Sequence, residues 1–457
     1  MHALAACQPG RALSPPESTN APPEVKQDIP SHSMANPLGI NEGVSVPAAW
    51  IKNRVIDTAG EKAELLADVQ AAQKLGATMV RANSPVFPFL DMQSMVKSNW
   101  DWGRADAWVQ AVQTTPIEAL VVLGPWPGNR TAAHTDHYVP DNMDDYADYI
   151  RRVVERYDGD GEDDMPGLVR PIRYWEVDNE PDLHNSVMPR GISLIDDPSQ
   201  FETPAQYAGV LVASAAAIRS ADPNAVVLSG GMYRPRTDTG RKYLKAVLNE
   251  PGVMDAFDIL SLHCYFDNNS LDPIEQTMAV AHELAPTKPV WITETGVPSS
   301  GKRSWIDVEW QATMVAAIVG GFLANGAERI FWHTLSDPPA RAKSSPFSTH
   351  SLMQTTAAQT GPRKAHPGNQ KVAKPAGEMY ERLALLLANR VPAETKEVPA
   401  IGGRLLWTGS GWLAFWGTPN VPSNAASVEN LRTGDITKPQ KSVVSPAWIS
   451  LEPPRNP

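Results

Sequence analysis

Residues 172–181, IRYWEVDNEP, combine the features of a buried β-strand with an unusual number of acids. The apolar and aromatic side chains are typical of a parallel strand that is covered on both faces. The run also carries Glu176, Asp178 and Glu180, and it ends at Pro181, which cannot continue the hydrogen-bond ladder of a strand. Buried carboxylates cost free energy unless they are paired, hydrogen-bonded or protonated. The stretch therefore predicts a strand that delivers acidic groups to a buried or half-buried site.

Similar runs recur along the chain, and amphipathic helical patterns separate them. Residues 143–157, for example, place a row of side chains at helical spacing: Tyr146, Ile150, Val153, Val154 and Tyr157. Eight strands alternating with helices predict an α/β fold, a (β/α)8 TIM barrel. A doubly wound open sheet is the rival, but no Gly-rich phosphate-binding fingerprint follows any of these runs. The eight predicted strands lie within 37–44, 77–87, 117–127, 172–181, 225–234, 257–266, 289–298 and 329–338.

The remaining segments depart from this alternation. Residues 1–36 are rich in Pro and Ser and are expected to form a disordered tether, whereas the barrel spans 37–392. Residues 337–373 form a long polar connection after the eighth strand. We expect residues 393–457 to form a small, incomplete β-rich appendage. Within it, GRLLWTGSGWLAFWG (403–417) predicts a hairpin of two short strands.

Charge and cysteine content exclude several classes of protein. The net charge of −11 argues against nucleic acid or an anionic membrane as a partner. The two cysteines lie far apart in the sequence, so neither a disulfide framework nor a cysteine-based zinc site is expected. Cys264, inside a predicted strand, is expected to be an inert buried thiol that points away from any site. No run of about 18 apolar residues predicts a transmembrane helix.

The N-terminal tetrapeptide LAAC (4–7) resembles a bacterial lipoprotein processing box. Only six residues precede Cys7, without a basic region or a full apolar stretch, so the segment is not a competent signal as written. Two interpretations stay open: a chance match, or a lipid anchor at Cys7 in a chain whose true start lies further upstream. The tether that follows favours export, and we expect an extracytoplasmic location, either secreted or on a membrane surface.

Two acids end different predicted strands of the barrel. Chemistry in such barrels sits at the carboxyl ends of the strands, where Glu180 ends the fourth and Glu294 ends the seventh. A pair of carboxylates from two strands suits cleavage of a glycosidic bond, because one acid protonates the leaving group while the other attacks or stabilises the developing cation. Nearby aromatic side chains offer flat faces to sugar rings. The other side chains at strand ends are Arg81, Trp126, Asn179, His263, Tyr265, Trp332 and His333.

Two motifs carry a resemblance to glycoside hydrolase clan A. YWEVDNEPD (174–182) resembles the clan's Asn-Glu acid/base motif, and WITETG (291–296) resembles its nucleophile motif. Arg81 after the second strand, the His-x-Tyr of LHCYF (262–266) and a Trp on the eighth strand agree with the same pattern. The helices are most similar to glycoside hydrolase family 39 and related bacterial exopolysaccharide hydrolases. The resemblance covers residues 37–392.

The resemblance implies a retaining glycoside hydrolase that cleaves β-linked bonds of a polysaccharide or oligosaccharide by double displacement, with no cofactor and no metal. Glu180 would be the acid/base, Glu294 the nucleophile, and Asn179 would hydrogen-bond the sugar 2-hydroxyl. The remaining roles would fall to Arg81 and Tyr265, which hold Glu294 ionised, to His263 in the same pocket, and to Trp332 as the floor of the central sugar subsite. Trp126, between two prolines, is either a sugar platform or a core residue.

Several alternatives remain beside this interpretation. A non-catalytic carbohydrate-binding barrel is disfavoured because both glutamates are present. Metal sites are suggested by HTDHYVPD (134–141) and DGDGEDD (158–164), but a rim loop and a solvated acidic turn explain these stretches better. Asp178 departs from the family pattern and is either a structural acid or a modulator of the pKa of Glu180. The sequence does not name the sugar, and it leaves endo and exo action open.

Overall fold

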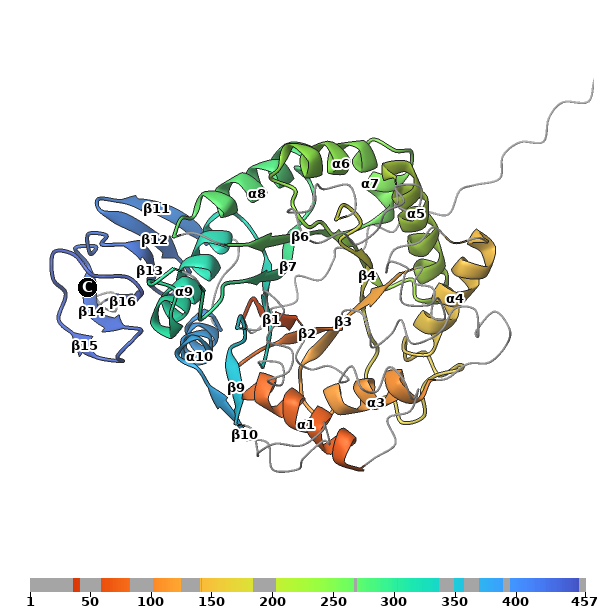
Figure 1. The fold of residues 1–457 in the computed structure, drawn as a ribbon, viewed down its shortest axis with the longest axis horizontal. Coiled ribbons are helices and arrows are strands. Elements are labelled where there is room, and N and C mark those ends of the chain that lie inside the picture. Colours follow the sequence, from red (N-terminus) through yellow and green to blue (C-terminus); the bar gives the residue numbers. More distant parts are fainter. Residues whose placement is uncertain are drawn as a thin grey trace, which may run out of the picture. The chain divides into compact units, whose positions relative to one another are not determined.

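The computed structural model describes residues 36–41, 59–82, 102–124, 140, 142–183, 203–266, 269–301, 303–336, 349–356, 370–388 and 395–451. Within these ranges the chain forms a ring of parallel strands surrounded by helices, followed by antiparallel strands (Figure 1). None of the helices described has the length and apolar character needed to cross a membrane.

Eight parallel strands form the barrel, and each of them overlaps one of the strands predicted from the sequence. They pair in the order β5-β4-β3-β2-β1-β8-β7-β6. Two isolated parallel bridges, Leu228 with Ile259 and Met232 with Leu262, join β5 to β6 and close the ring. The predicted TIM barrel is therefore confirmed. The strands are β1 (Leu38–Asn41), β2 (Met79–Ala82), β3 (Glu118–Leu123), β4 (Tyr174–Asn179), β5 (Val226–Gly231), β6 (Leu260–Tyr265), β7 (Val290–Gly296) and β8 (Arg329–His333).

Helices cover the outside of the ring and bury the apolar faces that the sequence pattern predicts. The five side chains predicted to line one face of residues 143–157 are all buried. Thr203 and Gln206 form a capping box at the start of the helix after β4, as expected for a Thr-Pro start. The helices are α1 (Ala59–Lys74), α3 (Gly103–Val112), α4 (Met143–Glu155), α5 (Pro204–Ala221), α6 (Asp238–Leu248), α7 (Val253–Ala256), α8 (Asp272–Leu284), α9 (Val308–Ala324) and α10 (Pro375–Leu387).

The C-terminal segment is a more complete sheet than the sequence indicates. The predicted hairpin is confirmed as β12 and β13, which pair in antiparallel fashion. Four further strands join it in a six-stranded sheet of order β11-β12-β13-β16-β14-β15. The predicted β-rich appendage thus contains more strands than the hairpin alone, and strands such as AASVEN, in β14, were not recognised because they are short and weakly apolar. The strands are β11 (Lys396–Ala400), β12 (Gly403–Trp407), β13 (Trp412–Gly417), β14 (Ala425–Asn430), β15 (Ile436–Thr437) and β16 (Ala447–Leu451); β9 (Met353–Thr356) and β10 (Gln370–Ala373) form a separate pair.

The six-stranded sheet shares a hydrophobic core with the outer helices of the barrel. Phe415 of β13 is 1% exposed and belongs to the same buried cluster as the helices. A Cβ atom at Gly320 of α9 would overlap Phe415, so the helix and the sheet approach as closely as a glycine allows. Arg432 adds polar contacts, donating to the Glu309 carbonyl at 2.8 Å and to the Thr313 hydroxyl at 3.1 Å. The sheet and the barrel should therefore unfold together.

Replacing Phe415 by Ala tests this shared core. We expect Phe415→Ala to lower the free energy of unfolding by about 3–5 kcal/mol, because it leaves a cavity under α9. Urea denaturation followed by circular dichroism would show one transition shifted to lower urea. The matched control is Ile436→Ala, at a position that is 69% exposed on β15, which should change stability by no more than about 0.5 kcal/mol. Two separate transitions in the wild-type protein would contradict a shared core.

Candidate active site

The fourth strand leaves regular β geometry where its acids lie. Asp178 has φ of +73° and Glu180 has φ of +55°, a left-handed conformation that side chains other than glycine rarely adopt. Because the alternation of the strand is broken there, the neighbours Asn179 and Glu180 both reach the open end of the barrel. Asn179 contacts Arg81, and Glu180 contacts His263. A regular strand would turn one of these two side chains away.

Hydrogen bonds to neighbouring elements hold this irregular backbone. Tyr207 of α5 donates its hydroxyl to the Val177 carbonyl at 3.1 Å and accepts from the Gly230 amide at 2.6 Å. The hydroxyl thus replaces a ladder bond between β4 and β5. One carboxylate oxygen of Asp178 accepts from the Asn179 amide at 2.6 Å. Asp178 therefore stabilises the bend, which agrees with the structural role among the two predicted for it.

The turn after Glu180 is fastened to the loop that follows β5. Asp182 is 1% exposed, and its carboxylate accepts from the Tyr233 amide at 2.6 Å and the Arg234 amide at 3.2 Å. Burial raises the pKa of Asp182 to about 6 despite these bonds, and the nearby Glu180 adds to the rise. The sequence motif NEPD contains this residue, but nothing in the sequence alone shows which backbone it holds.

Arg81 of β2 is the centre of the hydrogen-bond network inside the barrel. Its Nε lies 2.5 Å from Glu176, and its Nη1 lies 2.8 Å from Glu294 and 2.9 Å from the Asn41 side-chain oxygen. Its Nη2 donates to the Asn179 side-chain oxygen at 2.9 Å. Burial by itself would lower the pKa of Arg81, but the two glutamates raise it well above the ordinary value. The guanidinium is thus a fixed buried cation.

Glu176 is the inner partner of this cation and takes no part in the open site. It is fully buried, and besides Arg81 it accepts from the Ser261 hydroxyl at 2.7 Å and the Thr293 hydroxyl at 3.2 Å. Its carboxylate is therefore committed to contacts within the barrel. The ion pair with Arg81 accounts for the first of the three acids in the fourth strand.

Glu294 is held as an anion at the end of β7. The register of β7 against β8 shifts between Ile292 and Thr295, and such an irregularity lets the neighbours Thr293 and Glu294 both face inward. The Tyr265 hydroxyl donates to Glu294 at 2.6 Å. Burial raises the pKa of this carboxyl, but the charges of His263 and Arg81 and the Tyr265 bond outweigh that effect and lower it from 4.5 to about 2.

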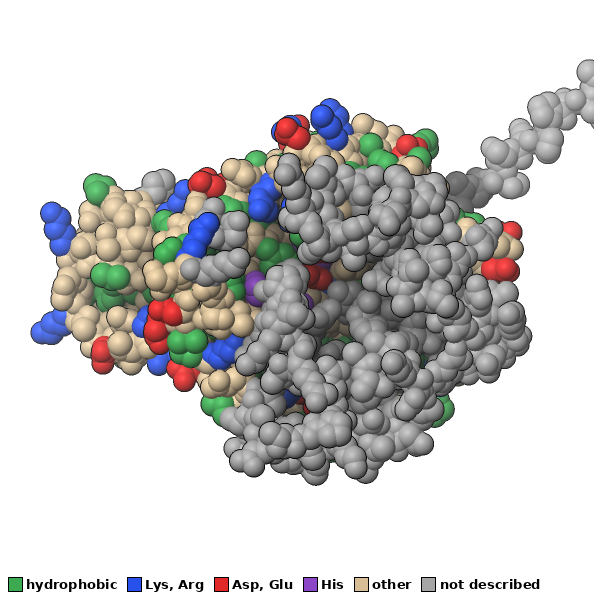
Figure 2. All heavy atoms as spheres, in the orientation of Figure 1, with side chains coloured by type: hydrophobic (Ala, Val, Ile, Leu, Met, Phe, Trp, Pro, Cys, Tyr) green, Lys and Arg blue, Asp and Glu red, His purple; other side chains and the backbone are tan. Residues whose placement is uncertain are grey.

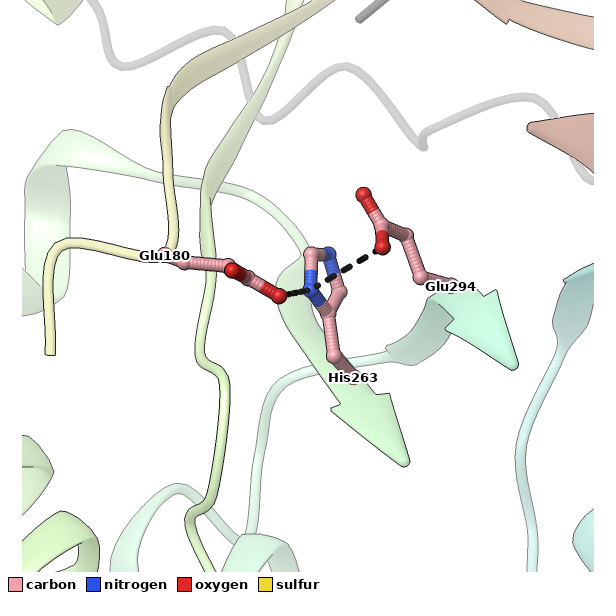
Figure 3. Close-up of side chains that lie close together, drawn as sticks. All are labelled: Glu180, His263 and Glu294. Atoms are coloured by element: carbon pink, nitrogen blue, oxygen red, sulfur yellow. Dashed lines mark hydrogen bonds and ion pairs between the residues drawn. The ribbon is translucent and has the colours of Figure 1, made fainter. Parts of the chain in front are cut away.

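His263 lies between Glu180 and Glu294 (Figure 3). Its Nδ1 is 2.8 Å from a Glu180 oxygen and 3.7 Å from a Glu294 oxygen. One oxygen of each carboxylate and a nitrogen of His263 all lie within 4.8 Å of one another. In Figure 2, acidic and histidine side chains are visible together in the hollow over the middle of the barrel. The two carboxylates are therefore neighbours across a single imidazole.

The protonation of His263 follows from its surroundings. Burial lowers the pKa of the imidazole, but Glu294 and the bond to Glu180 raise it overall. The direction of the bond between Nδ1 and Glu180 depends on which ring nitrogen carries the proton. Nε2 is buried and has no hydrogen-bond partner among the described residues. Gly231 lies against that side of the ring, and any Cβ there would overlap it, with Cδ2 only 2.6 Å away.

A second histidine of the site, His333, is joined to Arg81 through Asn41. Asn41 presents its side-chain oxygen to Arg81, which can only donate, and its amide nitrogen to His333 Nδ1, 3.1 Å away. Asn41 ends β1 and was not among the predicted site residues, although it occupies the same strand-end position that identified the others.

Trp332 corrects one prediction. It was expected to floor the sugar subsite, but it is 1% exposed and belongs to the hydrophobic cluster between strands and helices. Its indole N–H donates to the His350 carbonyl at 2.9 Å. The next residue, His333, faces the site instead. The rings of His333 and His350 both pack edge-on against the ring of Tyr265, each with a distance of 6.1 Å between ring centroids. Successive side chains of a strand face opposite ways, so an error of one position along the strand assigns the wrong one of the two residues to the site.

The other predicted positions lie elsewhere. Trp126 and the stretch 134–141 fall outside the described residues, apart from Pro140. Residues 158–164 form a turn before β4, away from the open end, where backbone amides donate to the acids. Glu155, Asp158 and Asp160 approach within 4.8 Å of one another, and burial raises the pKa of Asp158 to about 6. Cys264 is fully buried and contacts Thr277 of α8, as predicted for an inert thiol.

Removing the Tyr265 hydroxyl should make stability less dependent on acid pH. A carboxyl with a lowered pKa stabilises the fold above its ordinary pKa of 4.5, and this stabilisation is lost as the pH falls toward about 2. We expect Tyr265→Phe to lower the free energy of unfolding by about 1.5–3 kcal/mol at pH 7. The deficit relative to the wild type should shrink as the pH falls from 4.5 toward 3, measured by denaturant titrations at each pH.

The matched control is Tyr233→Phe, which removes a hydroxyl that contacts Arg234 rather than a carboxylate. Its effect on stability should be the same across this pH range. A Tyr265→Phe deficit that stayed constant down to pH 3 would show that the hydroxyl does not lower the pKa of Glu294.

Comparison with known proteins agrees with this geometry. The family model described as "Glycosyl hydrolase catalytic core" matches residues 179–353, a range that includes Glu180 and Glu294. No match to a curated protein was found.

Several solved structures share the fold at low sequence identity. A family 39 β-xylosidase from Caulobacter crescentus has 17% identity and a TM-score of 0.56, and the match covers 92% of this chain and 97% of the xylosidase. A family 51 α-L-arabinofuranosidase from Bifidobacterium longum has 12% identity and a TM-score of 0.56, with 92% and 95% coverage. A monomeric β-xylosidase from Caulobacter crescentus CB15 has 18% identity and a TM-score of 0.51, with 83% and 71% coverage.

At these identities the solved structures show the fold, and the family model adds the chemistry. The chain therefore carries the catalytic core of a glycosyl hydrolase, and the prediction that it is a glycoside hydrolase resembling clan A is confirmed.

Proposed function

We propose that the protein is a retaining glycoside hydrolase that cleaves β-linked glycosidic bonds by double displacement. The observation that supports this most is the approach of Glu180 and Glu294, which each place an oxygen within 4.8 Å of the other across His263. Retaining enzymes hold their carboxyl groups about 5–5.5 Å apart, whereas inverting enzymes need about 6.5–9.5 Å to admit a water molecule. The spacing here favours direct attack by one carboxylate.

The electrostatics of the site divide the two roles. Glu294 contacts the guanidinium of Arg81 and the hydroxyl of Tyr265, which keep it ionised for attack on the anomeric carbon. Glu180 contacts no cationic side chain other than His263 among the described residues, and it lies beside the negative charge of Glu294. Because Glu294 is the carboxylate held ionised, Glu180 is assigned as the acid that protonates the leaving oxygen.

Asn179 is placed to bind the reacting sugar. Its side-chain oxygen is taken by Arg81, so its amide nitrogen is left with two N–H donors. Asn179 directly precedes the acid/base Glu180 in the sequence and contacts the buried cation Arg81 in space. Donation from this amide to the sugar 2-hydroxyl would strengthen as positive charge develops on the ring in the transition state.

The substrate is proposed to be an oligosaccharide or polysaccharide with β-linked units. Structures similar to this chain include β-xylosidases, an exo-β-1,4-mannosidase and an endoxylanase, so the shared fold does not select one sugar. Aryl β-xylosides and β-mannosides are the first substrates to test. The alternative is a non-catalytic carbohydrate-binding barrel. Binding alone, however, would not require that one glutamate contacts Arg81 and Tyr265 while the other does not.

Replacing the two glutamates separately distinguishes their roles. Glu294→Ala removes the nucleophile, so we expect kcat on every substrate to fall by about 10⁴-fold or more. Glu180→Ala removes the proton donor, so an aryl glycoside with a good leaving group should still react in the first step and show a burst. Azide should restore turnover of Glu180→Ala and give the β-azide, which ¹H NMR of the product identifies.

Three outcomes would contradict these roles. If azide restored turnover of Glu180→Ala and the product was the α-azide, Glu180 would be the nucleophile and Glu294 the acid/base. NMR of the wild-type reaction showing the α-anomer as the first product would contradict retention. Full activity in both variants would contradict the catalytic pair, with Asp182→Asn as a control variant that perturbs the same turn but leaves both glutamates in place.

We also propose an extracytoplasmic location with a lipid anchor at Cys7, a residue outside the described ranges. The proposal rests on the LAAC sequence and the Pro-rich segment behind it. If it holds, cells that express the gene with its native upstream region should incorporate labelled palmitate into the protein, and Cys7→Ser should abolish the labelling. Equal cytoplasmic recovery of both forms without label would contradict it.

A further inference from the structure

We propose that Trp305, Trp310, Arg303 and Asn269 form a sugar-binding platform at the rim of the barrel that holds a unit of the substrate chain beyond the one that reacts. This inference rests on the proposed function as a glycoside hydrolase and deepens it, because such a platform is useful only for a substrate of several linked units. The four residues are called the Trp305 platform below.

The Trp305 platform lies on the face of the barrel that carries the catalytic pair. Trp305 is in the connection between β7, which ends beside Glu294, and α9. Asn269 is in the connection between β6, which carries His263 and Tyr265, and α8. Both connections leave the carboxyl ends of their strands, so both lie on the face where barrel enzymes bind substrate.

Trp305 is exposed in a way that sets it apart from the other apolar surface residues. Among the described residues, the exposed large apolar side chains are aliphatic except for Trp305, of which 37% is exposed. Its neighbour Val308 is 40% exposed as well. Isolated exposed apolar residues are common, but an indole on the substrate face of a glycoside hydrolase offers the flat apolar surface that the C–H side of a sugar ring covers.

The indole of Trp305 is held in one orientation before any ligand arrives. Its ring centroid is 4.9 Å from that of Trp310, and the ring planes meet at 71°, an edge-to-face contact. Trp310 is fixed in turn by its N–H, which donates to the Asn269 side-chain oxygen at 3.2 Å. This hydrogen bond joins the loop after β6 to the first turn of α9. A platform that is already ordered loses little conformational entropy when it binds.

The loop that carries the platform is itself anchored from below. Gln311 of α9 is fully buried, and its amide nitrogen donates to the carbonyls of Val297 at 2.9 Å and His350 at 3.0 Å. The Ser299 amide donates to the Thr349 carbonyl at 2.9 Å. These bonds tie the start of the loop to the segment after β8 that contacts Tyr265. The distance between the platform and the catalytic pair is therefore set by the fold.

Polar groups beside the indole match the hydroxyls of a sugar. The guanidinium of Arg303 lies over the Trp305 ring, 5.5 Å from its centroid, and is exposed. No carboxylate partner of Arg303 occurs in the described part of the chain, so its N–H donors face solvent. A flat apolar ring with hydrogen-bond donors at its edge suits a carbohydrate, whereas a protein partner would call for a wider apolar patch.

The test compares a substrate of one sugar unit with one of six. Trp305→Ala should leave kcat/KM on the 4-nitrophenyl β-glycoside that the wild type cleaves best within about twofold, because that substrate does not reach the platform. On the hexasaccharide of the matching series (xylohexaose, mannohexaose or cellohexaose) kcat/KM should fall about tenfold, through KM rather than kcat. Trp305→Phe should recover part of the loss, since it keeps a ring.

Two controls separate binding from folding. Leu385→Ala removes another exposed apolar side chain, 70% exposed on α10, and should change neither substrate. The Tm of Trp305→Ala should stay within about 2 °C of the wild type, because the indole is partly exposed. Titration of the three hexasaccharides into Glu294→Gln, with and without Trp305→Ala, measures binding without turnover, and the second substitution should weaken it about tenfold.

The outcomes distinguish this inference from the proposed function. Equal loss on the aryl glycoside and the hexasaccharide, or no loss on either, would overturn the platform while the glycosidase stands. Hexasaccharide binding that Trp305→Ala leaves unchanged would overturn it as well. A wild-type enzyme that cleaves no glycoside but binds a hexasaccharide through Trp305 would overturn the proposed catalysis and keep the platform as a carbohydrate-binding site.

Discussion

The buried guanidinium of Arg81 is the constraint on which the rest of the site depends. An arginine cannot give up its proton, and burying its charge is costly unless every donor is used. Here its donors reach side chains of β1, β4 and β7, so the position of three strand ends is tied to one planar group. The cation faces two carboxylates. Glu176, at the closed side, neutralises it, and the remaining negative charge belongs to Glu294 at the open end. The fold thus holds an anion at the site before substrate binds.

That fixed anion also determines how the second carboxyl behaves. Glu180 shares His263 with Glu294, and the charges of His263 and Arg81 lower the pKa of Glu294, so Glu294 is not the carboxyl that carries a proton. In the proposed mechanism, Glu294 attacks the anomeric carbon and forms the glycosyl-enzyme while Glu180 protonates the leaving oxygen. In the second step Glu180 acts as the base for the incoming water. The same geometry therefore serves both steps.

The sequence was most informative where local chemistry determines structure. All eight barrel strands were recognisable as apolar runs, and Glu180, Glu294, Arg81, Asn179, His263 and Tyr265 were found because each stands at a strand end. Trp332 and His333 stand at the same strand end, and the choice between them depends on the register shift in β7–β8, which no local pattern reveals. The left-handed conformation of Asp178 also depends on a distant partner, the Tyr207 hydroxyl. The local sequences of two segments do not reveal a long-range contact of this kind between them.

The spacing of the two glutamates depends on how the barrel closes. Glu294 is fixed through Arg81 to the β1, β2 and β7 side, whereas Glu180 is fixed through Tyr207 and Asp182 to α5 and the loop after β5. These two halves meet at the seam between β5 and β6, which two isolated bridges join together with the bond from the Ser261 amide to the Ser229 hydroxyl. The His263 amide donates to the Met232 carbonyl across this seam at 2.8 Å, and the side chain of the same residue contacts both carboxylates. Gly231 leaves the space that the imidazole needs there. The seam and the bonds of Arg81 to Asn179 and Glu294 together set the carboxylate separation, and with it the choice between attack by Glu294 and attack by water.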